Sequence, residues 1–275
     1  MLIRTSLPPP HRSRQESNPQ PQTNTTKMHH HCKTIGALAA ASALVAGNAQ
    51  AGTPTTTPAP VSPPASAIEF KLHTGYSSEY LWRGLDLGDD LIEAGLDVSA
   101  TWNGIGLSAG AWYASFQNSD VNVDELDLYA EVSKDFGFVK GSIGYIAYLY
   151  PNSNSPTYQE VYFGLSRDLG FATASLKYYW DVEGDNDGYS EFGLSRSFEL
   201  TSCLNLNLES NIGYLVEHGV ATAWTNKVSL DWGFVEHAKL SPFVALAISC
   251  TNDEYTSYWN SGNELVGGCM LSVTF

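Results

Sequence analysis

The sequence predicts an all-β fold, a transmembrane antiparallel up-and-down β-barrel of about 12 strands. First, most of the chain after residue 67 repeats one unit, a run of roughly ten to thirteen residues that alternate apolar and polar side chains before a break. Second, short and long breaks alternate along the chain. Third, aromatic residues, 12% of the chain, gather where the runs end, while charged residues are only 16%.

The chain divides into four parts. Residues 28–51 carry Lys33, an apolar stretch from Ile35 to Gly47 and an Ala-Gln-Ala end, which together predict a secretory signal peptide. Residues 1–27 are interpreted as a non-native start or, alternatively, as an extended n-region. Residues 52–67 are rich in Pro and Thr and predict a flexible linker. The barrel is expected at residues 68–275.

Twelve alternating runs predict the strands. In the run 171–182, for example, Leu176 and Trp180 share one face, and Lys177 lies on the other. Helical spacing is absent, and no apolar run outside the signal peptide is long enough for a transmembrane helix. In chain order, the expected strands are approximately 68–83, 90–102, 104–116, 123–135, 138–150, 157–168, 171–182, 188–199, 203–216, 221–233, 238–250 and 262–275.

The breaks between the runs are of two kinds. Those after the even-numbered runs are short, as at 103–104 and 136–138. Those after the odd-numbered runs are longer and polar, as at 84–90 and 251–262. Short turns at one end and long loops at the other are typical of outer-membrane barrels with an even number of strands.

Aromatic residues mark both ends of the runs. Two belts about one strand length apart are expected at two lipid–water boundaries, whereas a soluble β-sandwich would not place its aromatics at strand ends. The last run is expected to present Leu265, Leu271 and Phe275 to lipid and to close the barrel against the first run. The long-loop ends carry Tyr80, Trp82, Trp112, Tyr113, Tyr148, Tyr150, Tyr158, Tyr178, Trp180, Tyr189, Tyr214 and Trp224.

The opposite face of the runs is acidic and is expected to line a lumen. Acidic residues outnumber basic ones there, so pairing alone cannot neutralise them and water must reach many of them. The alternative is a lumen plugged by charge pairs, as in eight-stranded barrels. Arg83 is expected at the outer mouth, in a salt bridge or a solvated loop. The predicted pore-lining residues are Glu79, Glu93, Asp97, Glu125, Asp127, Glu131, Glu160, Lys177, Glu209 and Lys227.

No pattern in the sequence predicts an enzyme. His73, His218 and His237 lack a nucleophile and an orienting partner at one height of the barrel. No His or Cys pair has the spacing of metal ligands, and no Gly-rich phosphate loop occurs. We therefore expect no catalytic residue, no metal and no cofactor. A net charge of −15 also argues against nucleic-acid binding.

Three stretches resemble a known family. They are Thr74–Asp90, which contains the motif Ser-x-Tyr-x-x-Arg-Gly, the acidic run Asp124–Val132, and the Tyr-rich hairpin Gly144–Ser166. In this order they are similar to the TorF family of bacterial porins, over roughly residues 70–215. The resemblance implies a diffusion channel in the bacterial outer membrane.

Residues and resemblance together predict an outer-membrane porin, or a narrow diffusion channel for small solutes or ions, whose acidic lumen favours cations. The alternative is a structural or scaffold barrel with a plugged lumen that binds partners through its extracellular loops. The expected partners are outer-membrane lipid, small solutes or ions, and the barrel assembly machinery, which would recognise the strand ending in Phe275. We expect export through the periplasm and a monomer.

Overall fold

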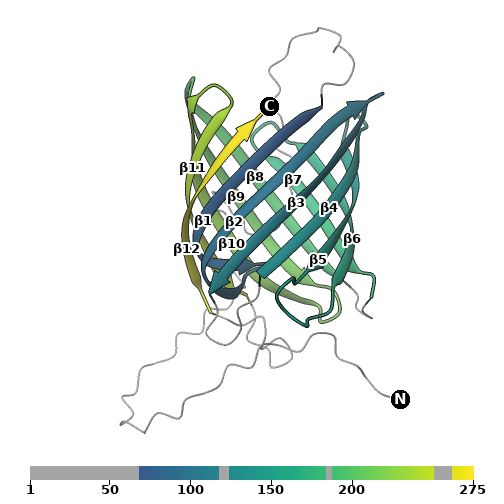
Figure 1. Cartoon of the computed structure of the whole chain (residues 1–275). Coiled ribbons are helices and arrows are strands. Elements are labelled where there is room, and N and C mark those ends of the chain that lie inside the picture. The colour runs from purple at the N-terminus through teal and green to yellow at the C-terminus, as the bar shows by residue number, and fades with distance from the viewer. Residues whose placement is uncertain (1–67, 118–123, 184–187, 251–261) are drawn as a thin grey trace, which may run out of the picture.

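The structure is a computed structural model and describes residues 68–117, 124–183, 188–250 and 262–275. These residues form twelve β-strands around one closed barrel, as Figure 1 shows. No helix among them is long and apolar enough to cross a membrane. The strands are β1 (Glu69–Trp82), β2 (Leu85–Trp102), β3 (Ile105–Gln117), β4 (Asp124–Asp135), β5 (Lys140–Leu149), β6 (Tyr158–Asp168), β7 (Thr173–Asp181), β8 (Tyr189–Thr201), β9 (Leu204–Leu215), β10 (Val220–Val235), β11 (Ala238–Ser249) and β12 (Glu264–Thr274).

The sheet closes between its first and last strands. Each strand pairs antiparallel with its neighbours in the chain, and β1 pairs with β12 from Lys71 opposite Thr274 onward. The backbone N–H groups of Phe70 and Phe275 each donate to the other residue's carbonyl oxygen, at 3.3 and 2.8 Å. Closure leaves no edge strand among the twelve. The predicted closed antiparallel barrel is confirmed.

The outer wall of the barrel is apolar. Large apolar side chains point outward at every second position, and they remain exposed, as Leu165 does at 51%. The last strand presents the predicted face, since Leu265, Leu271 and Phe275 are all exposed. An apolar surface that runs around the whole barrel suits a lipid environment far better than water.

Short turns join the strands at one end of the barrel, as predicted, but the first connection at the other end differs from the prediction. The expected loop at 84–90 is wrong, because residues 85–90 belong to β2 and pair with β1. Only Arg83 and Gly84 form the turn. Gly84 adopts a φ of 84°, a left-handed conformation that glycine tolerates best. The Gly and Asp residues that suggested a loop instead form a tight hairpin.

Two irregularities bend this first hairpin out of the wall. The register shifts between Tyr80 and Leu81 in β1 and between Asp89 and Ile92 in the pairing of β2 with β3. Such bulges kink a strand and increase its twist. As a result, the consecutive residues Tyr80 and Leu81 are both buried instead of alternating between the faces. The segment 80–87, which we call the inner hairpin, lies inside the barrel at the lower end of Figure 1.

The aromatic belt predicted at the long-loop end is only partly present. Tyr113, Trp180, Tyr214 and Trp224 are exposed on the outside, as a belt requires. The belt assignment is wrong for several others, which lie on the inner face. The two in β1 are carried there by the inner hairpin, and the rest occupy inward positions of the alternation. These inward residues are Tyr80, Trp82, Trp112, Tyr148, Tyr150, Tyr158 and Tyr189.

The predicted non-native start at 1–27, the signal peptide at 28–51 and the linker at 52–67 lie outside the described residues. The same holds for the central parts of three predicted long loops, at 118–123, 184–187 and 251–261. These assignments stay predictions.

Candidate functional site in the barrel lumen

The inner hairpin reaches across the lumen to the opposite wall. Its turn residue Arg83 leaves the seam side of the barrel and contacts Glu160 on β6, which is 77 residues away in the sequence. The guanidinium donates from Nη1 to Oε1 at 2.9 Å and from Nη2 to Oε2 at 2.6 Å. Both side chains are close to nine-tenths buried. This two-pronged arrangement is the strongest geometry available to an arginine–carboxylate pair.

Three aromatic rings surround the same guanidinium. Its central carbon lies 4.4 Å from the ring centre of Trp82, and 4.5 Å from those of Tyr179 on β7 and Tyr189 on β8. A cation over a ring face is attracted by the negative centre of the ring, and the attraction grows when water is excluded. We call Glu160, Tyr148, Tyr179 and Tyr189 the wall cage, because all four belong to the wall from β5 to β8.

Other residues of the inner hairpin fix it on both sides of Arg83. Leu81 is fully buried in a cluster with Ala245, Ala247 and Val266 of β11 and β12. On the other side of the turn, a side chain at Gly84 would overlap the methyl group of Ala223 on β10. Glycine is therefore required there for close approach as well as for its φ.

Lumenal carboxylates receive hydrogen bonds mainly from aromatic side chains. Tyr129 donates to Asp97 at 2.5 Å, and Tyr162 donates to Glu131 at 2.9 Å. The same pattern recurs with Tyr80 and Glu125 at 3.0 Å, Trp112 and Glu93 at 2.5 Å, and Tyr148 and Glu160 at 2.9 Å. A phenol or indole satisfies the hydrogen-bonding need of a carboxylate but does not cancel its charge.

Few basic side chains neutralise these acids. Lys71 pairs with Asp97 at 3.3 Å, and Lys239 pairs with Asp231 at 2.7 Å. Lys177 and Lys227 lie over the rings of Tyr162 and Phe243 instead. In the part of the chain that the structure describes, no Lys or Arg forms an ion pair with Glu93, Glu125, Asp127, Glu131, Glu191 or Glu209. The lumen therefore carries an excess of negative charge.

Two of the acids are almost completely covered by the inner hairpin and its neighbours. Glu125 is 4% exposed and Asp127 is 1% exposed. Tyr80 of the inner hairpin donates to Glu125, whereas neither carboxylate oxygen of Asp127 meets a hydrogen-bond donor among the described residues. The inner hairpin thus helps to bury Glu125.

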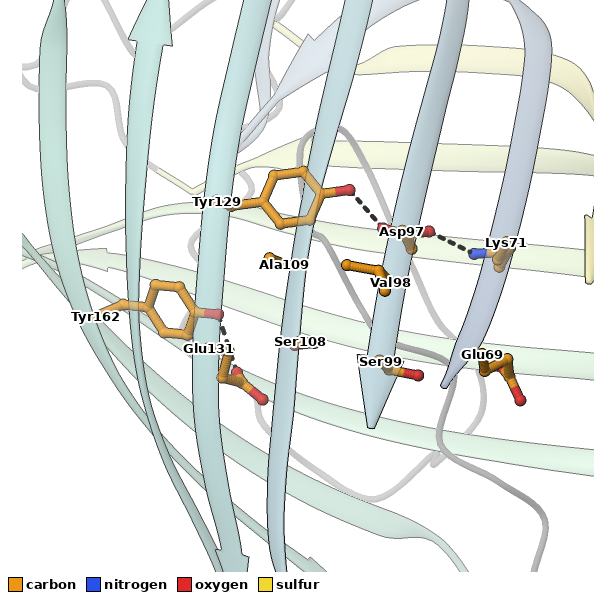
Figure 2. Close-up of a pocket in the computed structure, with 10 residues that line it drawn as sticks. All are labelled: Glu69, Lys71, Asp97, Val98, Ser99, Ser108, Ala109, Tyr129, Glu131 and Tyr162. Atoms are coloured by element: carbon orange, nitrogen blue, oxygen red, sulfur yellow. Dashed lines mark hydrogen bonds and ion pairs between the residues drawn. The ribbon is translucent and has the colours of Figure 1, made fainter. Parts of the chain in front are cut away.

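A small cavity of about 40 Å³ lies in the half of the lumen toward the short turns. Figure 2 shows it between side chains of neighbouring strands, with Tyr129 and Lys71 converging on Asp97, and Tyr162 on Glu131. Its charged lining is mostly acidic, with Glu69, Asp97 and Glu131 against Lys71. The cavity has room for a water molecule or a small ion.

All ten predicted pore-lining residues lie on the inner face of the barrel, although they differ in access. Asp97, Glu131, Lys177, Glu209 and Lys227 are partly exposed, as are Glu79 and Glu93, whereas Glu125, Asp127 and Glu160 are buried. Arg83 departs from its predicted place at the mouth, because the inner hairpin carries it into the lumen. Of the two alternatives for Arg83, the salt bridge is the one observed.

Sequence reasoning assigned no role to the lumenal tyrosines. Tyr129 shares its place in the alternation with Asp127 and Glu131, so the pattern already indicated its direction. The contact between Arg83 and Glu160 had no such signal, because it depends on two bulges. In the described ranges, no group of three or more His, Cys, Asp or Glu side chains is placed to hold a metal ion.

The chain belongs to a bacterial family of unknown function. The family model described as "Bacterial protein of unknown function (Gcw_chp)" matches residues 62–254, which is more than half of the chain. No curated protein matches this chain in sequence. The family match does not test the resemblance to TorF porins, which stays a prediction.

Several solved structures of outer-membrane channels are similar in fold. An outer-membrane channel from Pseudomonas putida F1 is 10% identical, with a TM-score of 0.49 over 78% of this chain and 97% of that chain. The NanC porin is 13% identical, with a TM-score of 0.48 over 74% and 98% of the two chains. The KdgM porin in complex with disordered oligogalacturonate is 11% identical, with a TM-score of 0.47 over 75% and 99%. Similarity this low concerns the barrel architecture and carries no function to this chain.

Proposed function

We propose that the protein is an outer-membrane channel that admits small solutes or ions and favours cations. The observation that carries the proposal is a set of three lumenal carboxylates, those of Glu93, Glu125 and Glu131. Each accepts a hydrogen bond from a tyrosine or tryptophan and forms no ion pair with Lys or Arg among the described residues. These groups leave a negative potential in a space walled by low-dielectric protein, which concentrates cations and repels anions. The resemblance to TorF porins points in the same direction.

The inner hairpin would set the width of such a channel. It occupies the lumen between Arg83 at the wall cage and Leu81 at β11 and β12, so solutes must pass beside it or displace it. The bidentate pair of Arg83 and Glu160 would then be the narrowest part of the path. A low conductance is expected for the closed arrangement.

A second candidate function rests on the same hairpin. If the hairpin never leaves the lumen, the barrel is a scaffold with a plugged interior, and its loops at the long-loop end bind partners. The buried contacts of Tyr80, Leu81 and Arg83 favour this alternative, because they hold the hairpin against both sides of the lumen. Electrical recording separates the two functions.

The test is single-channel recording in planar bilayers with a salt gradient across the membrane. The purified protein should give discrete conductance steps and a reversal potential that indicates cation preference. Glu131→Lys should lower this preference, since Glu131 lines the open cavity. Glu199→Gln, at the exposed short-turn end of β8, is the control and should have little effect. Silent bilayers with correctly folded protein would refute the channel and favour the scaffold.

Localisation and assembly are part of the proposal. An apolar outer wall supports insertion into the outer membrane. We propose that the barrel assembly machinery carries out this insertion and that the protein is a monomer. Folded outer-membrane barrels resist detergent and shift their gel migration only after heating. Protein that stays monodisperse without detergent and lacks this heat shift would contradict the assignment.

A further inference from the structure

We infer that the wall cage is a binding site for organic cations that carry a guanidinium group, and that Arg83 is its tethered occupant. The inference deepens the proposed channel function, on which it rests, by naming a solute class. Glu160, Tyr148, Tyr179 and Tyr189 supply the recognition, and Arg83 shows which chemical group fits among them. The inner hairpin is thus a built-in competitor of the solute.

The residues of the wall cage contact one another as well as Arg83. Tyr148 donates to Oε2 of Glu160 at 2.9 Å, which orients the carboxylate. The Tyr179 ring packs against those of Tyr162 and Tyr189, with ring centres 5.5 and 6.1 Å apart. All these residues belong to consecutive, hydrogen-bonded strands of the wall. When the hairpin withdraws, it leaves a preformed site with one carboxylate and two ring faces.

An empty wall cage would be unfavourable, which is the physical reason to expect a ligand. Glu160 is buried, and a buried carboxylate without a counter-charge is costly. Water or a cation must therefore replace Arg83 whenever the hairpin moves away. The flanking ring faces favour a weakly hydrated cation over a strongly hydrated inorganic one.

The geometry selects guanidinium among organic cations. Two parallel N–H bonds meet the two oxygens of Glu160, and the planar group lies against the rings of Tyr179 and Tyr189. A methylammonium ion carries the same charge but has no planar fork, so it cannot make both features of this contact at once. Binding should therefore be weaker for methylammonium than for methylguanidinium.

The site can be tested by chemical rescue. Arg83→Ala removes the tethered occupant, and methylguanidinium then fits the vacated space. Calorimetric titration of the detergent-solubilised variant should show saturable binding of methylguanidinium. The wild-type protein, whose wall cage is occupied, should show none. In bilayers, the same compound should reduce the conductance of Arg83→Ala and leave that of the wild type unchanged.

Two double variants, each with a second substitution added to Arg83→Ala, test whether methylguanidinium binds in the wall cage. Adding Glu160→Gln to Arg83→Ala should weaken binding by about thirtyfold or more, because it removes one partner of a buried charged pair. Adding Glu93→Gln instead should leave binding unchanged, since this lumenal carboxylate is held by Trp112 outside the wall cage. If Arg83→Ala fails to fold, as judged by gel migration before and after heating, Arg83→Gln takes its place.

The outcomes distinguish the site from the channel. Folded Arg83→Ala that binds no methylguanidinium, or binds it equally well with Glu160→Gln, overturns the inferred site even if the channel conducts. Saturable binding that depends on Glu160 supports the site even if every bilayer stays silent, in which case the proposed channel fails alone.

Discussion

Replacing Glu160 by Gln should release the inner hairpin. The change keeps the size of the side chain and removes the charge that faces the guanidinium of Arg83, which is bonded at 2.6 and 2.9 Å. Removing one partner of a buried pair costs about 3 kcal/mol, because the other charge is left unpaired. The Arg83 guanidinium then has a lower free energy in water than in the lumen, and the hairpin is expected to leave the lumen with it.

The size of the effect follows from that energy. About 3 kcal/mol corresponds to a shift of roughly a hundredfold or more in the equilibrium between the inserted and the released hairpin. Two contacts limit how far the release goes, the cluster around Leu81 and the hydrogen bond from Tyr80 to Glu125. The rest of the barrel should keep its fold, because Glu160 takes no part in its strand pairing through the side chain.

Limited digestion with trypsin measures this release. Trypsin cleaves after arginine, and the bond between Arg83 and Gly84 is protected in the wild type because both residues are held in the lumen. When opening is fast compared with cleavage, the cleavage rate follows the population of the open form. Glu160→Gln should therefore be cut at Arg83 about a hundredfold faster. Glu199→Gln serves as the control.

Two results would refute this reasoning. Equal cleavage of the wild type and Glu160→Gln at Arg83 would mean that the hairpin is already free. A folded Glu160→Gln protein that resists trypsin at this bond would mean that the pair of Arg83 and Glu160 does not hold the hairpin in place. N-terminal sequencing of the fragment locates the cut and separates it from cleavage at other basic residues.

Three further predictions concern the wall and the lumen. Leu165→Lys, on the exposed apolar face of β6, should destabilise the barrel in lipid vesicles by about 2–4 kcal/mol in urea titrations if that face meets the bilayer centre. Gly144→Ala should lower the free energy of unfolding by about 1–3 kcal/mol, because its new methyl group would overlap the Tyr162 ring. Gly267→Ala should change it little, because no atom lies within 4 Å of where its new methyl group would be. Cation preference in bilayers should weaken between 0.1 and 1 M salt, as the Debye length falls from about 10 Å to about 3 Å; an unchanged preference would place its origin in direct ion contacts.

The closed barrel could be predicted because alternation records which face of each strand is apolar. The run from Glu125 to Val132 alternates strictly, and its apolar members are those found outside. Antiparallel neighbours and short turns at one end then follow from the order of the runs. The register of the pairs did not follow, since it depends on bulges that the sequence does not mark.

The inner hairpin could not be predicted because its signals are ambiguous. The stretch from Gly84 to Asp90 has the composition of a surface loop. Long-range contacts hold it inside, among them the packing of Gly84 against Ala223 and the pair of Arg83 with Glu160. Contacts between residues so far apart in the chain leave no local pattern. The types of residue were visible in the sequence, but the contact between Arg83 and Glu160 was not.

The lumenal tyrosines show a different reason for error. Tyr148 and Tyr189 were assigned to an interfacial belt because aromatic residues near strand ends usually lie there. Their position in the alternation indicated the inner face, and the structure agrees with the alternation. Side-chain direction is fixed by backbone geometry, whereas belt membership is only a statistical tendency.

Strand β1 pairs with β12 to close the barrel, and its other end belongs to the inner hairpin. Because Leu81 packs against Val266 of β12, a nascent barrel can complete this inner contact only after the last strand has arrived. The contacts of the inner hairpin in the lumen therefore form fully only when β12 has paired. Intermediates with an unsealed wall should accordingly lack the trypsin protection of the Arg83–Gly84 bond.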